Sequence, residues 1–159
     1  MSHIVLYVGG PLTTGCFDKG IFNLWTWEQN VRRAEALALK IAELGIATIC
    51  PHTMARFWFG HVAEDVAIEM DNALLKRCDG LALVEGWQYS KGTKGEIALA
   101  HAHHMPVFET LDEIVHWAAE RVTQPIELPI AFGRCPDGGL HEWDEGKKEC
   151  RNCGKKRTL

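Results

Sequence analysis

The sequence predicts an α/β protein built on a doubly wound parallel sheet. Along the first 123 residues short apolar strands alternate with amphipathic helices, which is the pattern of parallel βαβ units. A glycine-rich turn, GWQYSKGTKG, follows one of the strands directly and leads into a helix. In open α/β sheets this edge, at the carboxyl ends of the strands, is where ligands bind. The chain of 159 residues fits one domain of about 120 residues and a small appendage.

The first half of this domain is expected to contain two strands and one long helix. Residues 3–8 form an apolar strand that ends in the turn at 9–11. Thr26 and Gln29 have the spacing of a capping box, so we expect the helix to start there. Residues 46–50 form the second strand. The apolar face of the helix consists of Val31, Ala34, Ala38, Ile41 and Ala42.

The second half is expected to complete the sheet. An aromatic loop at residues 57–59 should follow the second strand, and the next helix should carry an apolar stripe of Val66, Met70 and Leu74. The remaining elements are, in order, a helix over 62–77, a strand over 81–84, a helix over 94–104, a strand over 106–108 and a helix over 111–122.

Composition excludes several classes of function. The hydrophobic fraction of 47%, the charged fraction of 24% and the net charge of −4 are ordinary for a globular protein and favour neither a nucleic-acid nor a membrane partner. No apolar run is long enough to span a bilayer, and the N-terminus lacks a basic region followed by a long apolar one. We therefore expect a cytoplasmic protein without an organic cofactor. In that reducing compartment Cys16, Cys50 and Cys78 are interpreted as small buried hydrophobic residues.

The C-terminal segment has the ligand spacing of a zinc site. Residues 124–131 are interpreted as a stiff, proline-containing linker and residues 132–159 as a tail with the pattern C-x5-H-x8-C-x2-C. One nitrogen and three sulfur ligands form the tetrahedral set that structural zinc prefers. The predicted ligands are Cys135, His141, Cys150 and Cys153. The alternative is a disordered tail with three idle thiols, but such a polar segment has no core to hold it without a metal.

Four polar residues stand out as candidate site residues: Tyr7 at the end of the first strand, Asp71 at the edge of the helix over 62–77, Ser90 at the opening of the glycine turn, and Glu96 in the first turn of the next helix. The first and third strands of a doubly wound sheet are neighbours, so Tyr7 and Glu96 should meet at the carboxyl edge of the sheet. Backbone N–H groups of the two glycine turns can face an anion, which makes Gly9, Gly10 and Gly92 candidate substrate-binding residues.

Each of these residues also has a purely structural interpretation. Thr93 and Glu96 have capping-box spacing, and in this interpretation Glu96 serves only as a cap. Asp71 can be an ordinary surface acid, Tyr7 a strand residue with its hydroxyl at the rim, and Ser90 a turn residue. His52 ends the second strand near the same edge, and we assign it no role. Trp87 is interpreted equally well as a residue that stacks on a base or as one that packs in the core.

Taken together, the segments YVGGP, EMDNALLKRCD and GWQYSKGTKGEIALA resemble the nucleoside 2-deoxyribosyltransferase family. The similarity covers about residues 4–109 and is greatest to the small phage-type and bacterial members. It implies a flavodoxin-like fold, a homo-oligomer and cleavage or transfer at the N-glycosidic bond of a nucleoside or nucleotide. The zinc-like tail lies outside the resemblance.

The resemblance also implies roles for single residues. Glu96 stands at the position of the nucleophile, Asp71 at that of the acid that helps the base depart, and Tyr7 at that of the residue that orients the carboxylate. Ser90 stands where nucleotide-cleaving relatives have a serine that contacts the 5′-phosphate, while nucleoside-specific transferases often have an acid. The chain is therefore expected to prefer a 5′-monophosphate, since a carboxylate would repel a phosphate.

Two other functions are compatible with the same residues. One is a non-catalytic nucleotide-binding module whose zinc tail engages protein or nucleic acid. The other is an enzyme of phage DNA modification that uses this chemistry on an unusual base. An intact set of Tyr7, Asp71, Ser90 and Glu96 favours an enzyme, because a protein that only binds has no need of a nucleophile at the sugar.

Overall fold

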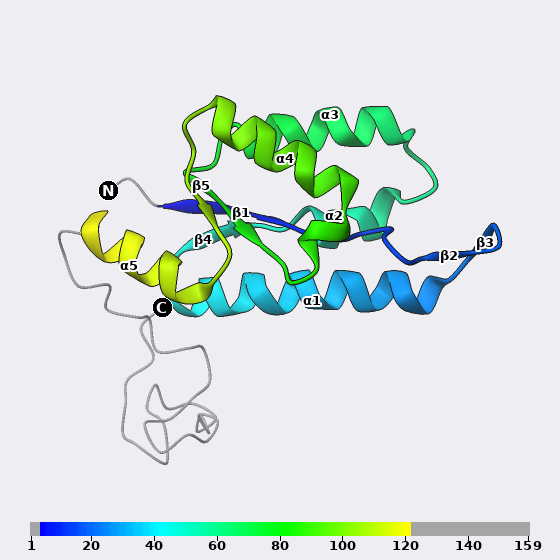
Figure 1. Ribbon diagram of the computed structural model, residues 1–159, viewed down its shortest axis with the longest axis horizontal. Coiled ribbons are helices and arrows are strands. Elements are labelled where there is room, and N and C mark those ends of the chain that lie inside the picture. The colour runs from blue at the N-terminus through cyan, green and yellow to red at the C-terminus, as the bar shows by residue number, and fades with distance from the viewer. Residues whose placement is uncertain (1–3, 122–159) are drawn as a thin grey trace, which may run out of the picture. The chain divides into compact units, whose positions relative to one another are not determined.

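The computed structural model describes residues 4–121, which form an α/β domain around a four-stranded parallel sheet (Figure 1). The strands are β1 (Val5–Gly9), β4 (Ala47–Ile49), β5 (Gly80–Leu83) and β6 (Val107–Phe108). Their order in the sheet is β4-β1-β5-β6. The second strand of the chain, β4, therefore lies on one side of β1, and the later strands β5 and β6 lie on the other side. This order is compatible with a flavodoxin-like fold. The predicted linker and tail lie outside the described residues.

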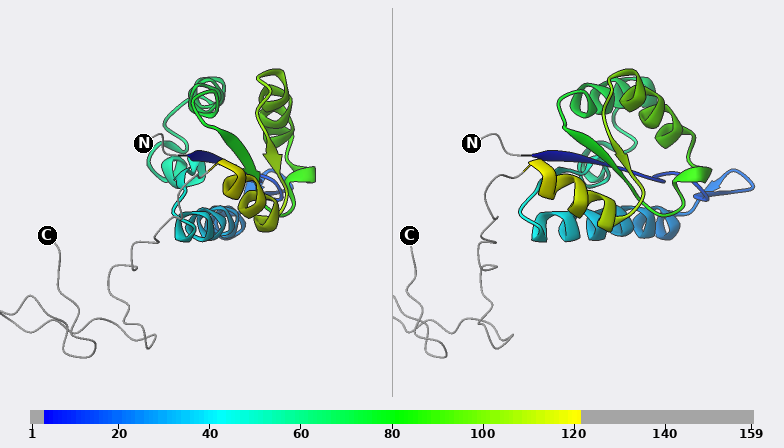
Figure 2. Two further views of the ribbon diagram at one scale, coloured as in Figure 1. Left: turned by 90° about the vertical axis from the view of Figure 1, so that its left-hand side faces the viewer. Right: turned by 60° about the vertical axis from the view of Figure 1, so that its left-hand side comes forward.

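Helices cover both faces of the sheet and give the domain three layers (Figures 1 and 2). One face is covered by α1 (Leu24–Glu43) and α5 (Leu111–Arg121), and the other by α3 (Glu64–Leu75) and α4 (Lys91–Ala102). All four were expected from the sequence, with ends that differ by at most three residues. No helix in residues 4–121 has the length and apolar character needed to span a membrane.

Alternation along β1 sends neighbouring side chains to opposite layers. Leu6 and Val8 belong to the core formed with α1 and α5, where Ala34, Ala38, Ile41, Ile114 and Ala118 are also buried. Tyr7 lies between them in sequence and packs in the second core with Leu75, Leu81 and Ala100, under α3 and α4. The period of two therefore directs the phenol toward the α3–α4 layer.

Three details of the first half differ from the sequence-based expectation. The expected loop before α1 contains a small hairpin of β2 (Phe17–Asp18) and β3 (Ile21–Phe22). The expected aromatic loop is largely a helix, α2 (Pro51–Trp58), which begins with proline at its first position. The predicted Thr26–Gln29 capping box is wrong, because Asn23 caps α1 and its Oδ1 accepts from the Thr26 N–H at 3.1 Å.

Of the three cysteines within residues 4–121, Cys16 and Cys78 are buried as expected and Cys50 is half-buried.

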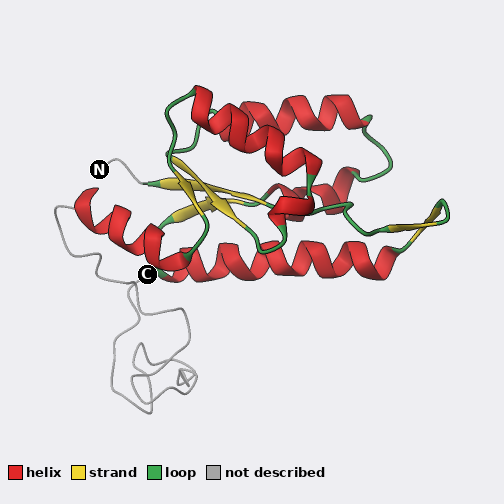
Figure 3. Ribbon diagram, viewed as in Figure 1, coloured by secondary structure: helices red, strands yellow, loops and turns green. Residues whose placement is uncertain are grey.

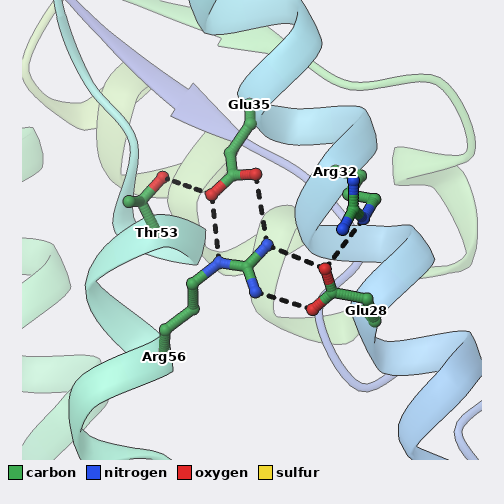
Figure 4. A network of polar contacts seen from close by, with 5 residues as sticks. All are labelled: Glu28, Arg32, Glu35, Thr53 and Arg56. Carbon is green, nitrogen blue, oxygen red and sulfur yellow. Dashed lines mark hydrogen bonds and ion pairs between the residues drawn. The ribbon is translucent and has the colours of Figure 1, made fainter.

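A cluster of charged side chains joins α2 to α1 (Figure 4). The guanidinium of Arg56 on α2 contacts Glu28 at 2.6 Å and Glu35 at 3.1 Å, both on α1. Thr53 donates to the same Glu35 oxygen at 3.2 Å, and Arg32 contacts Glu28 at 2.8 Å. Because two carboxylates of α1 share the guanidinium of Arg56, these contacts fasten α2 to α1.

Candidate functional site

The candidate site begins with a hydrogen bond between residues 89 positions apart in sequence. Tyr7, fully buried in the middle of β1, donates from its hydroxyl to Oε1 of Glu96 on α4 at 2.8 Å. The two strand ends are neighbours, since Gly9 of β1 is paired with Leu83 of β5, and α4 follows β5 in the chain. The predicted meeting of Tyr7 and Glu96 is confirmed, and the interpretation of the Tyr7 hydroxyl as a rim group is wrong.

The Glu96 carboxylate lies directly against the backbone of Gly9. A Cβ atom added at Gly9 would lie 2.6 Å from Oε2 of Glu96 and 3.0 Å from Cδ1 of Leu81. The carboxylate can therefore lie against the strand only because residue 9 has no side chain. Gly10 is equally constrained, since its added Cβ would lie 2.5 Å from Cβ of Val84.

The second oxygen of Glu96, Oε2, is buried and has no hydrogen-bond partner among the described residues. Burial raises the pKa of Glu96 to about 7, opposed by the hydrogen bond from Tyr7 and reinforced by the nearby charge of Asp71. Near neutral pH Glu96 therefore exists both as a carboxylate and as a carboxylic acid. In the ionised form, Oε2 is an unsolvated electron-pair donor.

Tyr7 remains a hydrogen-bond donor throughout the physiological range. Its pKa is raised far above the ordinary value of 10, first by burial and then by the negative charges of Glu96 and Asp71. Since the phenol keeps its proton, it fixes Oε1 of Glu96 and leaves Oε2 as the reactive atom.

Asp71 adds a second acidic group from α3. The predicted apolar stripe of this helix is wrong in part, because Val66 and Met70 are exposed whereas Asp71 is half-buried. Its Oδ1 is buried and unpartnered among residues 4–121, and burial raises the pKa of this carboxyl to about 6. Asp71 is thus not an ordinary surface acid, and it is poised to exchange a proton near neutral pH.

Ser90 caps the helix that carries Glu96. It is the N-cap of α4, and its buried Oγ accepts from the Thr93 N–H at 3.2 Å and from the Thr93 hydroxyl at 2.9 Å. The Thr93–Glu96 capping box is therefore wrong, since the helix starts three residues earlier and Glu96 points to Tyr7. The N–H groups of Lys91 and Gly92 lie in the first turn, where α-helical geometry offers no intrahelical acceptor.

Space is left on α4 beside Glu96. Gly92 lies one helical turn before Glu96, and a Cβ added there would meet only Ser90 Oγ, at 4.0 Å. At Gly95 an added Cβ would meet no described atom within 4 Å. The space at these two positions is open, so a ligand can approach the first turn of α4.

His52, which sequence analysis placed near this edge without a role, contacts the turn after β1. The imidazole is buried, with Nε2 3.2 Å from the carbonyl oxygens of both Gly10 and Pro11, the residues that follow Gly9. Burial lowers the pKa of His52, so the ring is neutral and its Nε2–H donates to this turn. A proline-histidine pair directly after a strand was the available signal, since it marks the start of α2 at the same edge.

The metal prediction concerns other residues. Within residues 4–121 no group of three or more histidine, cysteine, aspartate or glutamate side chains is arranged to hold a metal ion. Cys135, His141, Cys150 and Cys153 lie outside the described residues, so the zinc site stays a prediction.

Comparison with known proteins gives one match. No curated protein and no solved structure matches the chain. A family model described as a domain of unknown function, DUF7768, matches residues 20–110, which is more than half of the chain. The matched region runs from the β2–β3 hairpin to β6 and contains Asp71, Ser90 and Glu96, while Tyr7 and Gly9 precede it. The chain belongs to the DUF7768 family.

Proposed function

We propose that the protein cleaves or transfers at the N-glycosidic bond of a (2′-deoxy)nucleoside or its 5′-monophosphate, with Glu96 as the nucleophile. The carrying observation is the Glu96 carboxylate, held at Oε1 by Tyr7 and unpaired at the buried Oε2. Retaining glycosyl transfer needs one ionised carboxylate at the anomeric carbon and one acid for the leaving group. Glu96 and Asp71 supply these two groups, and the resemblance to 2-deoxyribosyltransferases supports the assignment.

In the proposed first step, Oε2 of Glu96 attacks C1′ of the sugar and a carbon–oxygen bond forms as the carbon–nitrogen bond breaks. The base leaves with the electron pair of that bond and takes a proton from Asp71. In the second step the oxygen of water, or a nitrogen of a second base, attacks C1′ and the ester bond to Glu96 breaks. The proton lost by the attacking group returns to Asp71, and Glu96 is again a carboxylate.

The first turn of α4 favours a phosphate on the substrate. The N–H groups of Lys91 and Gly92 and the positive end of the helix dipole attract an anion, and Gly92 leaves room for it. The exposed Lys91 and Lys94 side chains add positive charge. Ser90 keeps a hydroxyl rather than a carboxylate at this turn, which supports a 5′-monophosphate as the substrate.

Two further proposals concern assembly and metal. The exposed apolar side chains of Val66, Ile68 and Met70 on α3 support a homo-oligomer. We also propose one structural zinc bound by Cys135, His141, Cys150 and Cys153. Metal analysis should then find about one zinc per chain, and Cys150→Ser should release it with little change in the melting of the α/β domain. Freshly prepared protein with much less zinc would contradict this.

The direct test is incubation with a panel of nucleosides and their 5′-monophosphates, followed by chromatography of the released base. Release of free base, or exchange when a second base is present, is the expected result. Thermal-shift measurements on the same panel report binding separately. A monophosphate that raises the melting temperature but is never cleaved would instead identify a non-catalytic nucleotide-binding protein.

A further inference from the structure

A cavity lies at the same edge of the sheet, between the end of β5 and the end of β6. It has a volume of about 360 Å³, within the range of small-ligand sites. Leu83 at the end of β5 and Glu109 just after β6 line it, together with the connection from β5 to α4 (Figure 3). That connection supplies the other lining residues: Glu85, Gly86, Trp87, Gln88 and Tyr89. The cavity shares no lining residue with the set of Tyr7, Asp71 and Glu96.

The lining combines flat apolar surfaces with hydrogen-bond acceptors. Trp87 is half-buried against the core that also contains Leu83, while Tyr89 is 81% exposed and offers its ring to solvent. Glu85 and Glu109 are exposed carboxylates that come from different strand ends. Among the described residues that line the cavity, none is a lysine, arginine or histidine. A phosphate or carboxylate ligand is therefore disfavoured here, in contrast to the first turn of α4.

The backbone of the cavity wall is defined by Gly86. This residue has φ of +86°, in the left-handed region that favours glycine, and caps the short 3-10 helix η1 (Trp87–Tyr89). A Cβ added to Gly86 would lie 3.7 Å from Cγ of Pro11, in the turn that His52 holds. The part of the cavity lining at Gly86 therefore lies beside Pro11, in the turn that follows β1.

We propose that this cavity binds a planar heterocycle that carries amino groups, the class to which adenine and cytosine belong. A flat ring can stack on the indole of Trp87 or the phenol of Tyr89, and such stacking stabilises binding beyond the burial of apolar area. Exocyclic amino groups donate to the Glu85 and Glu109 carboxylates, and such charge-assisted hydrogen bonds are the strong ones. Heterocycles with oxygen in place of the amino group present an acceptor to the same carboxylates and are rejected.

The test uses two matched pairs of ligands and the full-length protein. Calorimetric titration should show binding of adenine and cytosine, and binding of hypoxanthine and uracil about tenfold weaker or undetectable. Glu85→Gln and Glu109→Gln should each lower the affinity for adenine and cytosine by about tenfold, because a neutral amide replaces a charged acceptor. Glu120→Gln, an exposed position on α5 outside the cavity, is the matched control and should bind normally.

Binding in the cavity does not depend on the role proposed for Glu96. Glu96→Gln should keep the affinity for adenine and cytosine unchanged, so the two proposals fail separately. The cavity proposal is overturned if neither amino heterocycle binds at about 5 mM. It is also overturned if cytosine and uracil bind equally, or if both glutamine variants bind like the control.

Discussion

The two faces of the sheet differ in what the same strands place on them. On the face under α1 and α5, β1 contributes Leu6 and Val8, and they pack only against apolar side chains. On the face under α3 and α4, the intervening residue is Tyr7, which holds Glu96 near a half-buried Asp71. One face is a closed apolar core, whereas the other contains two buried carboxylate oxygens without partners among residues 4–121.

This difference has an energetic cost and a chemical consequence. A buried acceptor without a partner costs about 1–3 kcal/mol, so the two unpaired carboxylate oxygens lower the stability of the α3–α4 face. The same burial raises the pKa of Glu96 to about 7 and that of Asp71 to about 6. Perturbed carboxyl groups of this kind are typical of functional sites, and the comparison predicts that activity and stability respond to substitutions on different faces.

The largest expected effect is that of Glu96→Gln on activity. Glutamine cannot form a glycosyl-enzyme at a useful rate, so base release should fall by about three orders of magnitude or more. The Tyr7 hydroxyl can still donate to the amide oxygen, so fold and ligand binding should persist. Chromatographic rates for this variant and for Glu69→Gln, an exposed acid on α3, separate the site from a general loss of charge. Near-normal turnover in Glu96→Gln would refute the glycosidic mechanism.

The same substitution should change how stability depends on pH. The folded-state pKa of Glu96 is raised to about 7, so its protonated form stabilises the fold at low pH and this stability is lost as pH rises from about 4.5 to 7. The loss is at most about 3 kcal/mol for a shift of this size. Urea unfolding at several pH values should show this fall in the native protein and a flatter curve in Glu96→Gln. Parallel curves would mean that Glu96 is not buried as described.

Asp71→Asn should alter the pH profile of activity as well as its rate. The reaction needs Glu96 ionised and Asp71 protonated, so the profile should be bell-shaped with apparent pKa values of about 6 and 7. Removing the acid should lower the rate about 10²- to 10⁴-fold and abolish the alkaline limb. The remaining limb should then report the ionisation of Glu96 alone, with a pKa slightly below about 7, because the charge of Asp71 no longer raises it. A rate loss with an unchanged profile would point to a structural role for Asp71.

Leu6→Ala and Tyr7→Phe compare the two faces at adjacent positions of one strand. Leu6→Ala creates a cavity in the apolar core and should lower the free energy of unfolding by about 2–5 kcal/mol. Tyr7→Phe keeps the ring and should cost less stability. It removes the hydrogen bond that lowers the pKa of Glu96, so the alkaline limb of activity, which follows the higher of the two pKa values, should shift to higher pH. Equal effects on stability and on the pH profile would show that the two faces do not divide these functions.

The strand order and the meeting of Tyr7 with Glu96 were predictable because both follow from hydrophobic periodicity and the topology of parallel sheets. The elements that were missed carry weak signals. β2 and β3 have two residues each, and Pro51 marks the end of a strand and the start of a helix equally well. The unpaired Oε2 of Glu96 and its close approach to Gly9 depend on distances of a few ångströms between residues far apart in sequence. No spacing rule contains such distances.

The smallest expected effect concerns the phosphate and tests whether the first turn of α4 binds it. Asp and Asn both serve well as N-caps, so Ser90→Asp and Ser90→Asn should each keep the cap on α4 and differ only in charge. With a 5′-monophosphate at this turn, Ser90→Asp should lose affinity for it by about tenfold relative to Ser90→Asn, while affinity for the nucleoside stays equal. Titrations of both variants with a nucleoside and its monophosphate measure this difference. If both variants lose the same affinity for the monophosphate, the effect is steric and the phosphate does not lie at Ser90.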